Sequence, residues 1–139
     1  MAAGIREARA SYTIVAKKSV LGAKVINSGG EDLGKIEDMV IDMRNNRVAY
    51  AILSFGGLFG VGDKHFAIPW EALAFDLSEK VAVLNVDKDR LSNAPGFDKD
   101  SWPDMADTRW GTTLHQHYGY KPYWEEDATE VPPARPVQL

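Results

Sequence analysis

The sequence contains no cysteine, and this absence removes several classes of function. Without thiols the chain has no disulfide bridges, no metal site built on thiolates and no cysteine nucleophile. Long apolar runs are also missing. The longest run in the first 30 residues is Ile14-Val15-Ala16, too short for a signal-peptide core, and no stretch approaches the roughly 20 apolar residues of a membrane-spanning helix. We therefore expect a soluble, cytoplasmic protein with no membrane insertion.

Positive charge is scarce as well. The 139 residues carry 16 Lys and Arg against 20 Asp and Glu, a formal net charge of −4. A general nucleic-acid binder has a strongly basic surface instead. RNA binding would therefore need a local patch, built from residues such as Lys17, Lys18, Arg44 and Arg47. Hydrophobic residues at 45% and charged residues at 26% are typical of an ordinary globular chain.

From about Val20 the chain consists of short apolar runs separated by turn residues, a pattern typical of a β-sandwich or small barrel. It predicts strands over 23–26, 34–43, 48–55, 64–70 and 80–86, with one helical turn at 69–73. The connections are too short for crossover helices, and the strand at 48–55 is apolar on both faces, which places it in mid-sheet. Because closure removes exposed edges, we expect a mainly β fold: a small closed antiparallel β-barrel with a partly helical C-terminal extension.

The predicted organisation has four parts: an N-terminal arm at 1–18, the barrel domain at 19–90, an aromatic extension at 91–124 and a flexible tail at 125–139. Near the start of the extension, one or two helical turns are predicted before Pro95-Gly96. A helix is expected to begin near Pro103 and to be interrupted at Gly111, and a further helix to stop at Gly119.

A run of glycines between 56 and 62 raises the question of phosphate binding. A Walker loop needs Gly-x4-Gly-Lys-Ser/Thr followed by a helix. Here Asp63 follows Gly62 where lysine is required, and a strand is predicted next. The spacing of the glycines also fails the dinucleotide fingerprint. The run is therefore interpreted as a turn between two strands.

Two groups of side chains are candidate interaction sites. The first is the apolar tip of that turn, which either packs on its own barrel or contacts a partner: Leu58, Phe59 and Val61. The second is a set of aromatic residues crowded into the extension: Trp102, Trp110, Tyr118, Tyr120, Tyr123 and Trp124. Such rings are enriched in binding hot spots. The favoured interpretation is that they hold the extension on its own barrel, and the alternative is a surface that faces a partner or a second copy.

Carboxylates cluster in the predicted strand at 34–43 but form no catalytic pair. Glu37 and Asp38 are neighbours, and neighbours on a strand point to opposite faces. Asp42 precedes a turn of Arg and Asn residues and is interpreted as the cap of that turn. No Gly-x-Ser-x-Gly motif occurs. The sequence therefore predicts no catalytic residue.

The three histidines are the only candidate nitrogen ligands for a metal ion. His115 and His117 lie on opposite sides of the predicted helix and cannot share an ion, and His65 has no identifiable partner. All three are therefore expected at the surface or at an interface. Asp87-Lys88-Asp89 lacks the glycine and glutamate of a calcium loop. No metal or cofactor is predicted.

Four blocks of sequence, in this order, resemble the PRC-barrel domain. They are VLG at 20–22 with Val25, GEDLGKIEDMVID at 30–42, VAYAILSFGG at 48–57 and FAIPWEAL at 66–73. The resemblance spans roughly 19–86 and implies a small β-barrel that binds other macromolecules, with no catalytic residues to carry across. The segment 97–124 is similar to extensions of stand-alone bacterial members. The membrane helix of the photosynthetic H subunit and the N-terminal domain of the ribosome-maturation factor, two other members, are missing.

The resemblance and the residues together predict a non-enzymatic interaction or structural module that acts through self-association, as a homodimer, or through a protein partner. Two alternatives stay open. One is an RNA-binding or ribosome-associated module that uses the local basic patch, and the other is a small ligand-binding or hydrolytic barrel that uses the carboxylates or His65. Strong salt dependence of binding would favour the first, and a deep pocket with convergent polar groups the second.

Overall fold

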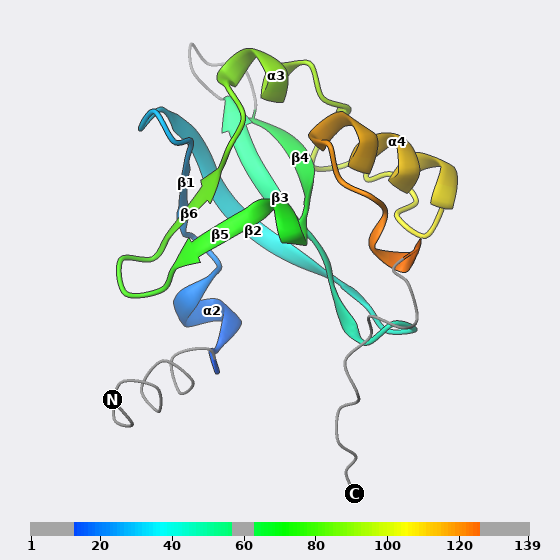
Figure 1. Cartoon of the computed structure of the whole chain (residues 1–139), viewed down its shortest axis with the longest axis horizontal. Coiled ribbons are helices and arrows are strands. Elements are labelled where there is room, and N and C mark those ends of the chain that lie inside the picture. Colours follow the sequence, from blue (N-terminus) through cyan, green and yellow to red (C-terminus); the bar gives the residue numbers. More distant parts are fainter. Residues whose placement is uncertain (1–12, 57–62, 126–139) are drawn as a thin grey trace, which may run out of the picture.

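The computed structural model describes residues 13–56 and 63–125 (Figure 1). The helices and 3₁₀ turns are α2 (Ala16–Ser19), η2 (Trp70–Ala72), α3 (Lys88–Ser92), α4 (Thr108–Tyr118) and η3 (Tyr123–Glu125). The strands are β1 (Lys24–Ile26), β2 (Asp32–Asp42), β3 (Arg47–Gly56), β4 (Asp63–Pro69), β5 (Leu73–Asp76), β6 (Val81–Leu84) and β7 (Gly96–Phe97). The five predicted strands and the helical turn after Pro69 are present, and the mainly β class is confirmed.

All seven strands belong to one sheet in the order β5-β6-β1-β2-β3-β4-β7. Every neighbouring pair is antiparallel except β1 and β6, which are parallel. Within the described residues the sheet does not close, so the predicted closed barrel and its purely antiparallel pairing are wrong in these respects. Its edges are protected by brevity instead, since β5 has four residues and β7 two. The parallel pair needs no crossover helix because the chain between β1 and β6 itself forms the intervening strands.

Strand β3 lies between β2 and β4, as its apolar sequence predicted, and Ala49 to Leu53 are almost fully buried. Its partner β2 carries two register shifts, between Ile36 and Asp38 and between Val40 and Ile41. A bulge adds a residue and breaks the alternation of the strand. For this reason Glu37 and Asp38 are both exposed, whereas strict alternation predicted opposite faces. The second shift lies next to Ile41, which is 50% exposed.

The extension packs on the sheet and completes its core. Helix α4 lies beside β4 (Figure 1), and Leu114, Tyr118 and Tyr123 join the same buried cluster as the strands. The helix begins after Asp107, whose carboxylate accepts a hydrogen bond from the Arg109 backbone N–H, and not near Pro103 as predicted. It ends as predicted at Gly119, which adopts a left-handed conformation with φ of 81°.

The predicted interruption of this helix at Gly111 is wrong, because the glycine lies inside an unbroken helix for a packing reason. A Cβ atom there would come within 2.5 Å of the Trp124 ring and 2.9 Å of the Tyr50 hydroxyl. A helical glycine costs about 1 kcal/mol relative to alanine. Here it permits the close approach of the helix to β3 and η3, which offsets that cost.

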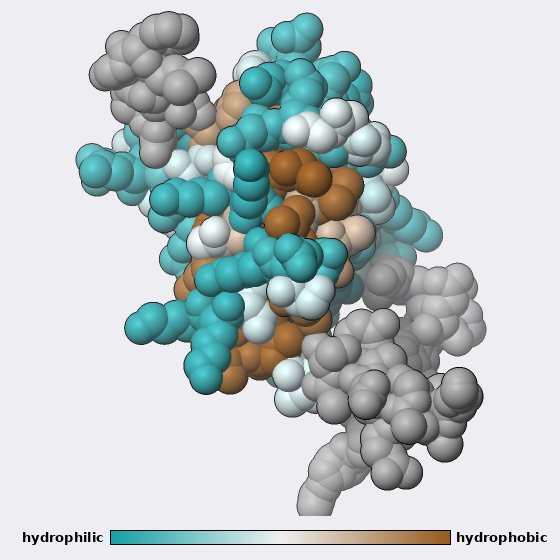
Figure 2. Space-filling view, turned by 90° about the vertical axis from the view of Figure 1, so that its left-hand side faces the viewer, coloured by the Kyte–Doolittle hydropathy of each residue, from teal (hydrophilic) through white to brown (hydrophobic). Residues whose placement is uncertain are grey.

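The other side of the molecule has apolar surface among polar side chains, over β1, β6 and their surroundings (Figure 2). The apolar residues that are half-buried on these strands are Ile26, Val81 and Val83. Among the described residues, no helix has the length and apolar character needed to cross a bilayer.

Candidate functional site

An apolar groove opens between the β2–β3 hairpin and the extension, around a cavity of about 550 Å³. One wall comes from the hairpin and the neighbouring strand: Val40, Ile41, Asp42, Met43, Arg44, Asn45, Ala49 and Tyr50. The other comes from the extension: Met105, Ala106, Thr108, Tyr123 and Trp124. Met43 is 82% exposed and Ile41 is 50% exposed, the two highest values among the large apolar side chains of the hairpin and extension. Surface of this kind is typical of a contact site.

The hairpin turn that carries Met43 is held by Asp42, as predicted from the sequence. Its carboxylate Oδ1 accepts hydrogen bonds from the backbone N–H groups of Arg44 at 2.9 Å and Asn45 at 3.0 Å. The Asn45 amide donates to Oδ2 at 2.8 Å, and Asn46 has the positive φ of 56° that asparagine tolerates. Met43 is therefore presented to solvent by an ordered turn.

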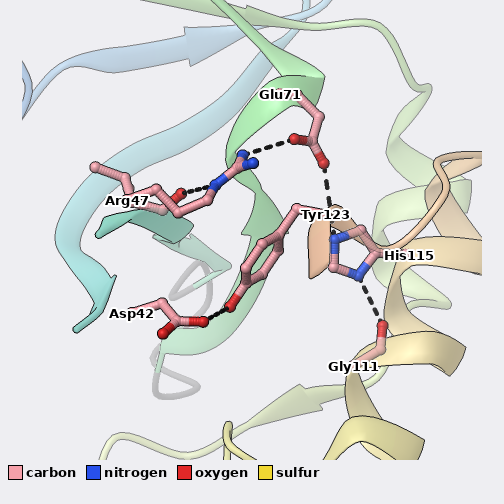
Figure 3. Close-up of polar contacts among 7 residues, drawn as sticks. Asp42, Arg47, Glu71, Gly111, His115 and Tyr123 are labelled. Atoms are coloured by element: carbon pink, nitrogen blue, oxygen red, sulfur yellow. Dashed lines mark hydrogen bonds and ion pairs between the residues drawn. The ribbon is translucent and has the colours of Figure 1, made fainter. Parts of the chain in front are cut away.

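A set of polar contacts, which we call the polar latch, joins this hairpin to the extension. It consists of Asp42, Arg47, Glu71, His115 and Tyr123 (Figure 3). The Tyr123 hydroxyl donates to the Asp42 carboxylate, and the Arg47 guanidinium lies 4.5 Å from the centre of the Tyr123 ring. Arg47 Nη2 donates to Glu71 Oε2 at 2.8 Å, and Glu71 Oε1 is 3.8 Å from His115 Nε2. The latch thus connects β2, β3 and η2 to α4 and η3.

These contacts fix the charge states of three groups near the groove. The hydrogen bond from Tyr123, followed by that from Asn45, lowers the pKa of Asp42 from 3.8 to about 2. Burial, followed by the bond to Asp42, raises the pKa of Tyr123 above its usual range. Burial, followed by the charge of Glu71, raises the pKa of Tyr50 to about 12. At neutral pH Asp42 is a carboxylate and both tyrosines are protonated, so none is suited to exchange a proton with a substrate.

His115 corrects the expectation that all three histidines lie at a surface or interface, because it is 0% exposed. Its Nδ1 lies 2.8 Å from the Gly111 carbonyl oxygen, which can only accept, so Nδ1 carries a proton and Nε2 faces Glu71. Nε2 has no hydrogen-bond partner in the structure. A signal for this burial was present in the sequence: Gly111, Leu114, His115 and Tyr118 follow the i, i+3, i+4, i+7 spacing of a buried helix face.

The other two histidines are half-buried. His117 Nε2 is 2.9 Å from the Arg90 carbonyl oxygen, and the Arg90 guanidinium donates to the His117 carbonyl oxygen, which ties α3 to α4. The His65 ring lies against Phe97 and Trp102, at 5.9 and 6.2 Å between centroids. Among the described residues, no group of three or more His, Asp or Glu side chains is placed to hold a metal ion.

The aromatic residues predicted as an interaction group divide between interior and surface. Tyr118 and Tyr123 are buried at 7% exposure, and Trp110 and Trp124 are half-buried against the core. Trp102 and Tyr120 are exposed at 45% and 39%. Of the group, Tyr123 and Trp124 line the groove.

The predicted apolar tip lies outside the described residues: Leu58, Phe59 and Val61. Sequence reasoning missed Ile41 and Met43, although a methionine beside a turn cap was a visible signal. It was overlooked because Met43 was taken as the end of a strand.

The basic residues considered for RNA come from separate elements. Lys17 and Lys18 belong to α2, and Arg44 belongs to the β2–β3 turn. Arg47 contacts Glu71 and Tyr123 in the polar latch. The four residues are thus divided among α2, the turn and the latch.

Comparison with known proteins identifies one relationship. The family model of the PRC-barrel domain matches residues 13–91, and no curated protein matches the chain. The match contains the hairpin wall of the groove and ends before the extension wall, which begins at Met105. The groove and the polar latch therefore lie where the matched region meets the segment that follows it.

Proposed function

The chain belongs to the PRC-barrel domain family, and from this premise we propose that it is a non-catalytic module that binds a protein partner through the apolar groove. Domains of this family are often involved in interactions. The observation that carries the proposal is Met43, a large apolar side chain 82% exposed on an ordered turn at the rim of a cavity of about 550 Å³. Covering such surface on association is favourable by about 25 cal/mol for each Å² of apolar area.

The polar chemistry around the groove supports recognition over catalysis. Both oxygens of Asp42 accept hydrogen bonds that hold the turn or the extension. The Tyr123 hydroxyl is occupied by Asp42, and Arg47 is engaged by Glu71. Groups held in this way order the two walls, and the groove offers mainly apolar contact to a partner.

A small-ligand site is the second candidate, because the cavity volume falls within the roughly 300–1,000 Å³ of typical ligand pockets. It is less supported than protein binding, since ligand pockets enclose their ligand and Met43 projects into solvent at the rim. RNA binding is less supported again, because Arg47 is paired within the chain.

Site-specific photocrosslinking tests the proposal. Photoreactive p-benzoylphenylalanine replaces Met43 in one variant and, as a matched control, Glu79 in the exposed β5–β6 turn in another. After irradiation in cells that express the chain, we expect discrete protein adducts from position 43 that are absent from position 79. The adducts should be lost when Ile41→Asp is added, because a charge in the groove opposes apolar contact. Indistinguishable adduct patterns from both positions would refute the proposal.

A further inference from the structure

The groove presents both a projection and a hollow on the same molecule. Met43 projects from the hairpin wall, and the cavity between the two walls lies beside it. A foreign partner could fill the hollow or cover the projection, but a second copy supplies the complement of both at once. In an isologous contact across a two-fold axis, each feature meets its counterpart twice.

We propose that the groove is the interface of a symmetric homodimer, in which Met43 of each protomer enters the cavity of the other. This inference rests on the proposed function and names its partner. A methionine side chain is unbranched and adaptable, so it fills irregular apolar spaces. The floor it would meet includes Val40, Met105 and Trp124, and the cavity of about 550 Å³ has room for it.

Charge is distributed across the groove in a self-complementary way. The hairpin wall carries the exposed Arg44, and the extension wall begins beside the exposed Asp104. The next carboxylate, Asp107, is 3.6 Å from Arg109. A two-fold axis that exchanges the walls brings Arg44 of one protomer towards Asp104 of the other. Opposite charges at the rim of an interface favour encounter and register.

The two walls are also held in place before any partner arrives. The Asp42 carboxylate orders the turn next to Met43 and accepts the Tyr123 hydroxyl from the opposite wall. Preorganisation of this kind lowers the entropy cost of association. The apolar surface over β1 and β6 in Figure 2 lacks these features, since Ile26, Val81 and Val83 are half-buried and no hollow accompanies them among the cavities found in the described residues.

Solution mass is the first test, measured by light scattering on the full chain over a concentration series in moderate salt. The expected mass approaches twice the 15.4 kDa of one chain. Met43→Asp should raise the dissociation constant at least tenfold while the melting curve stays cooperative. The matched control is Val15→Asp, which adds the same charge at an apolar residue that is 59% exposed beside α2, and which should leave the mass unchanged.

Cysteine pairing tests the arrangement itself, since the chain has no cysteine to interfere. A mixture of Met43→Cys chains and Ala106→Cys chains should form a disulfide-linked dimer under mild oxidation. Each variant alone should form much less, because only the mixture brings position 43 of one protomer to position 106 of the other. Equal linkage in the mixture and in the separate variants would overturn this arrangement.

The failures of the two proposals are distinguishable. A chain that remains monomeric throughout the series, but gives adducts of another protein from position 43, overturns the homodimer and leaves the proposed function standing. A dimer that Met43→Asp does not weaken overturns the assignment of the interface to the groove. A monomer that gives no adduct from position 43 overturns both.

Discussion

Two polar centres in the molecule are built in opposite ways. The first surrounds Asn27, whose side chain is 7% exposed. Its Oδ1 accepts from the backbone N–H groups of Gly29 at 3.1 Å and Glu31 at 2.9 Å, and its amide donates to Glu31 Oε1 at 2.7 Å and to the Val86 carbonyl at 3.1 Å. Three of these four bonds join residues no more than four positions apart. Only the bond to Val86 spans a long separation, of 59 positions.

The polar latch depends instead on long separations. Tyr123 and Asp42 are 81 positions apart, and Arg47 and Glu71 are 24 apart. His115, buried at its far end, leaves Nε2 without a hydrogen bond. The contrast teaches that the Asn27 centre stabilises a turn within the sheet, while the latch forms only when the extension docks. Removing latch contacts should therefore release the extension before the sheet unfolds.

The largest effect is expected at the Asn27 centre. Asn27→Ala removes four hydrogen bonds and leaves buried backbone groups unpaired, so the free energy of unfolding should fall by about 3 kcal/mol. Urea denaturation measures this change. Asn45→Ala, on the exposed hairpin, is the control and should cost about 1 kcal/mol or less. Equal losses from the two variants would remove the distinction between the centres.

The close packing of α4 gives the next largest effect. Gly111→Leu places side-chain atoms where Tyr50 and Trp124 lie, and should lower the free energy of unfolding by about 2 kcal/mol. Tryptophan fluorescence should shift to longer wavelength as the extension leaves the sheet. Thr113→Leu adds the same side chain to an exposed position of α4 and should change stability by less than about 0.5 kcal/mol. An unshifted spectrum for Gly111→Leu would contradict the packing argument.

The bond between the two walls of the groove comes third. Tyr123→Phe removes the hydroxyl that donates to Asp42 and should cost about 1.5 kcal/mol, as expected for a hydrogen bond to a charged group. The expected signature is faster amide hydrogen exchange in η3 and α4 than in β3. The control is Tyr120→Phe at an exposed tyrosine, which should leave exchange unchanged.

The same variant should alter the dependence of stability on pH. The pKa of Asp42 is about 2 in the folded chain, below its model value of 3.8. Its contribution is therefore present above pH 4 and is lost as pH falls from about 4 to about 2. Thermal melts over this window should show a smaller drop for Tyr123→Phe than for the unmodified chain. Parallel pH profiles would mean that Tyr123 is not the cause of the lowered pKa.

The smallest effect is expected for the ion pair of the latch. Arg47 and Glu71 have side chains that are 26% and 30% exposed, so solvent screens their attraction. Glu71→Gln should lower the free energy of unfolding by about 0.5 kcal/mol, measured by urea denaturation. Glu79→Gln, in the exposed β5–β6 turn, serves as the control and should be neutral. A loss above that of Tyr123→Phe would make this pair the main contact of the latch.

The outcome of sequence reasoning follows the same division between local and distant contacts. Period-two apolar runs predicted five strands, the paired apolar faces of 48–55 placed β3 in mid-sheet, and turn chemistry identified Asp42 as a cap and Gly119 as a helix end. Each of these features depends on residues a few positions apart. The buried face of α4 was also readable, but the expectation of a break at Gly111 hid its spacing.

The sequence by itself determined the mainly β character, the position of most strands and the turns, because propensity and hydrogen bonding act between near neighbours. Only the tertiary structure decided that the sheet stays open, that β1 and β6 run parallel, that His115 is buried, and that Met43 stands beside a hollow. These outcomes depend on which distant segments pack together. That choice reflects the balance of burial against chain entropy over the whole molecule, which no local pattern encodes.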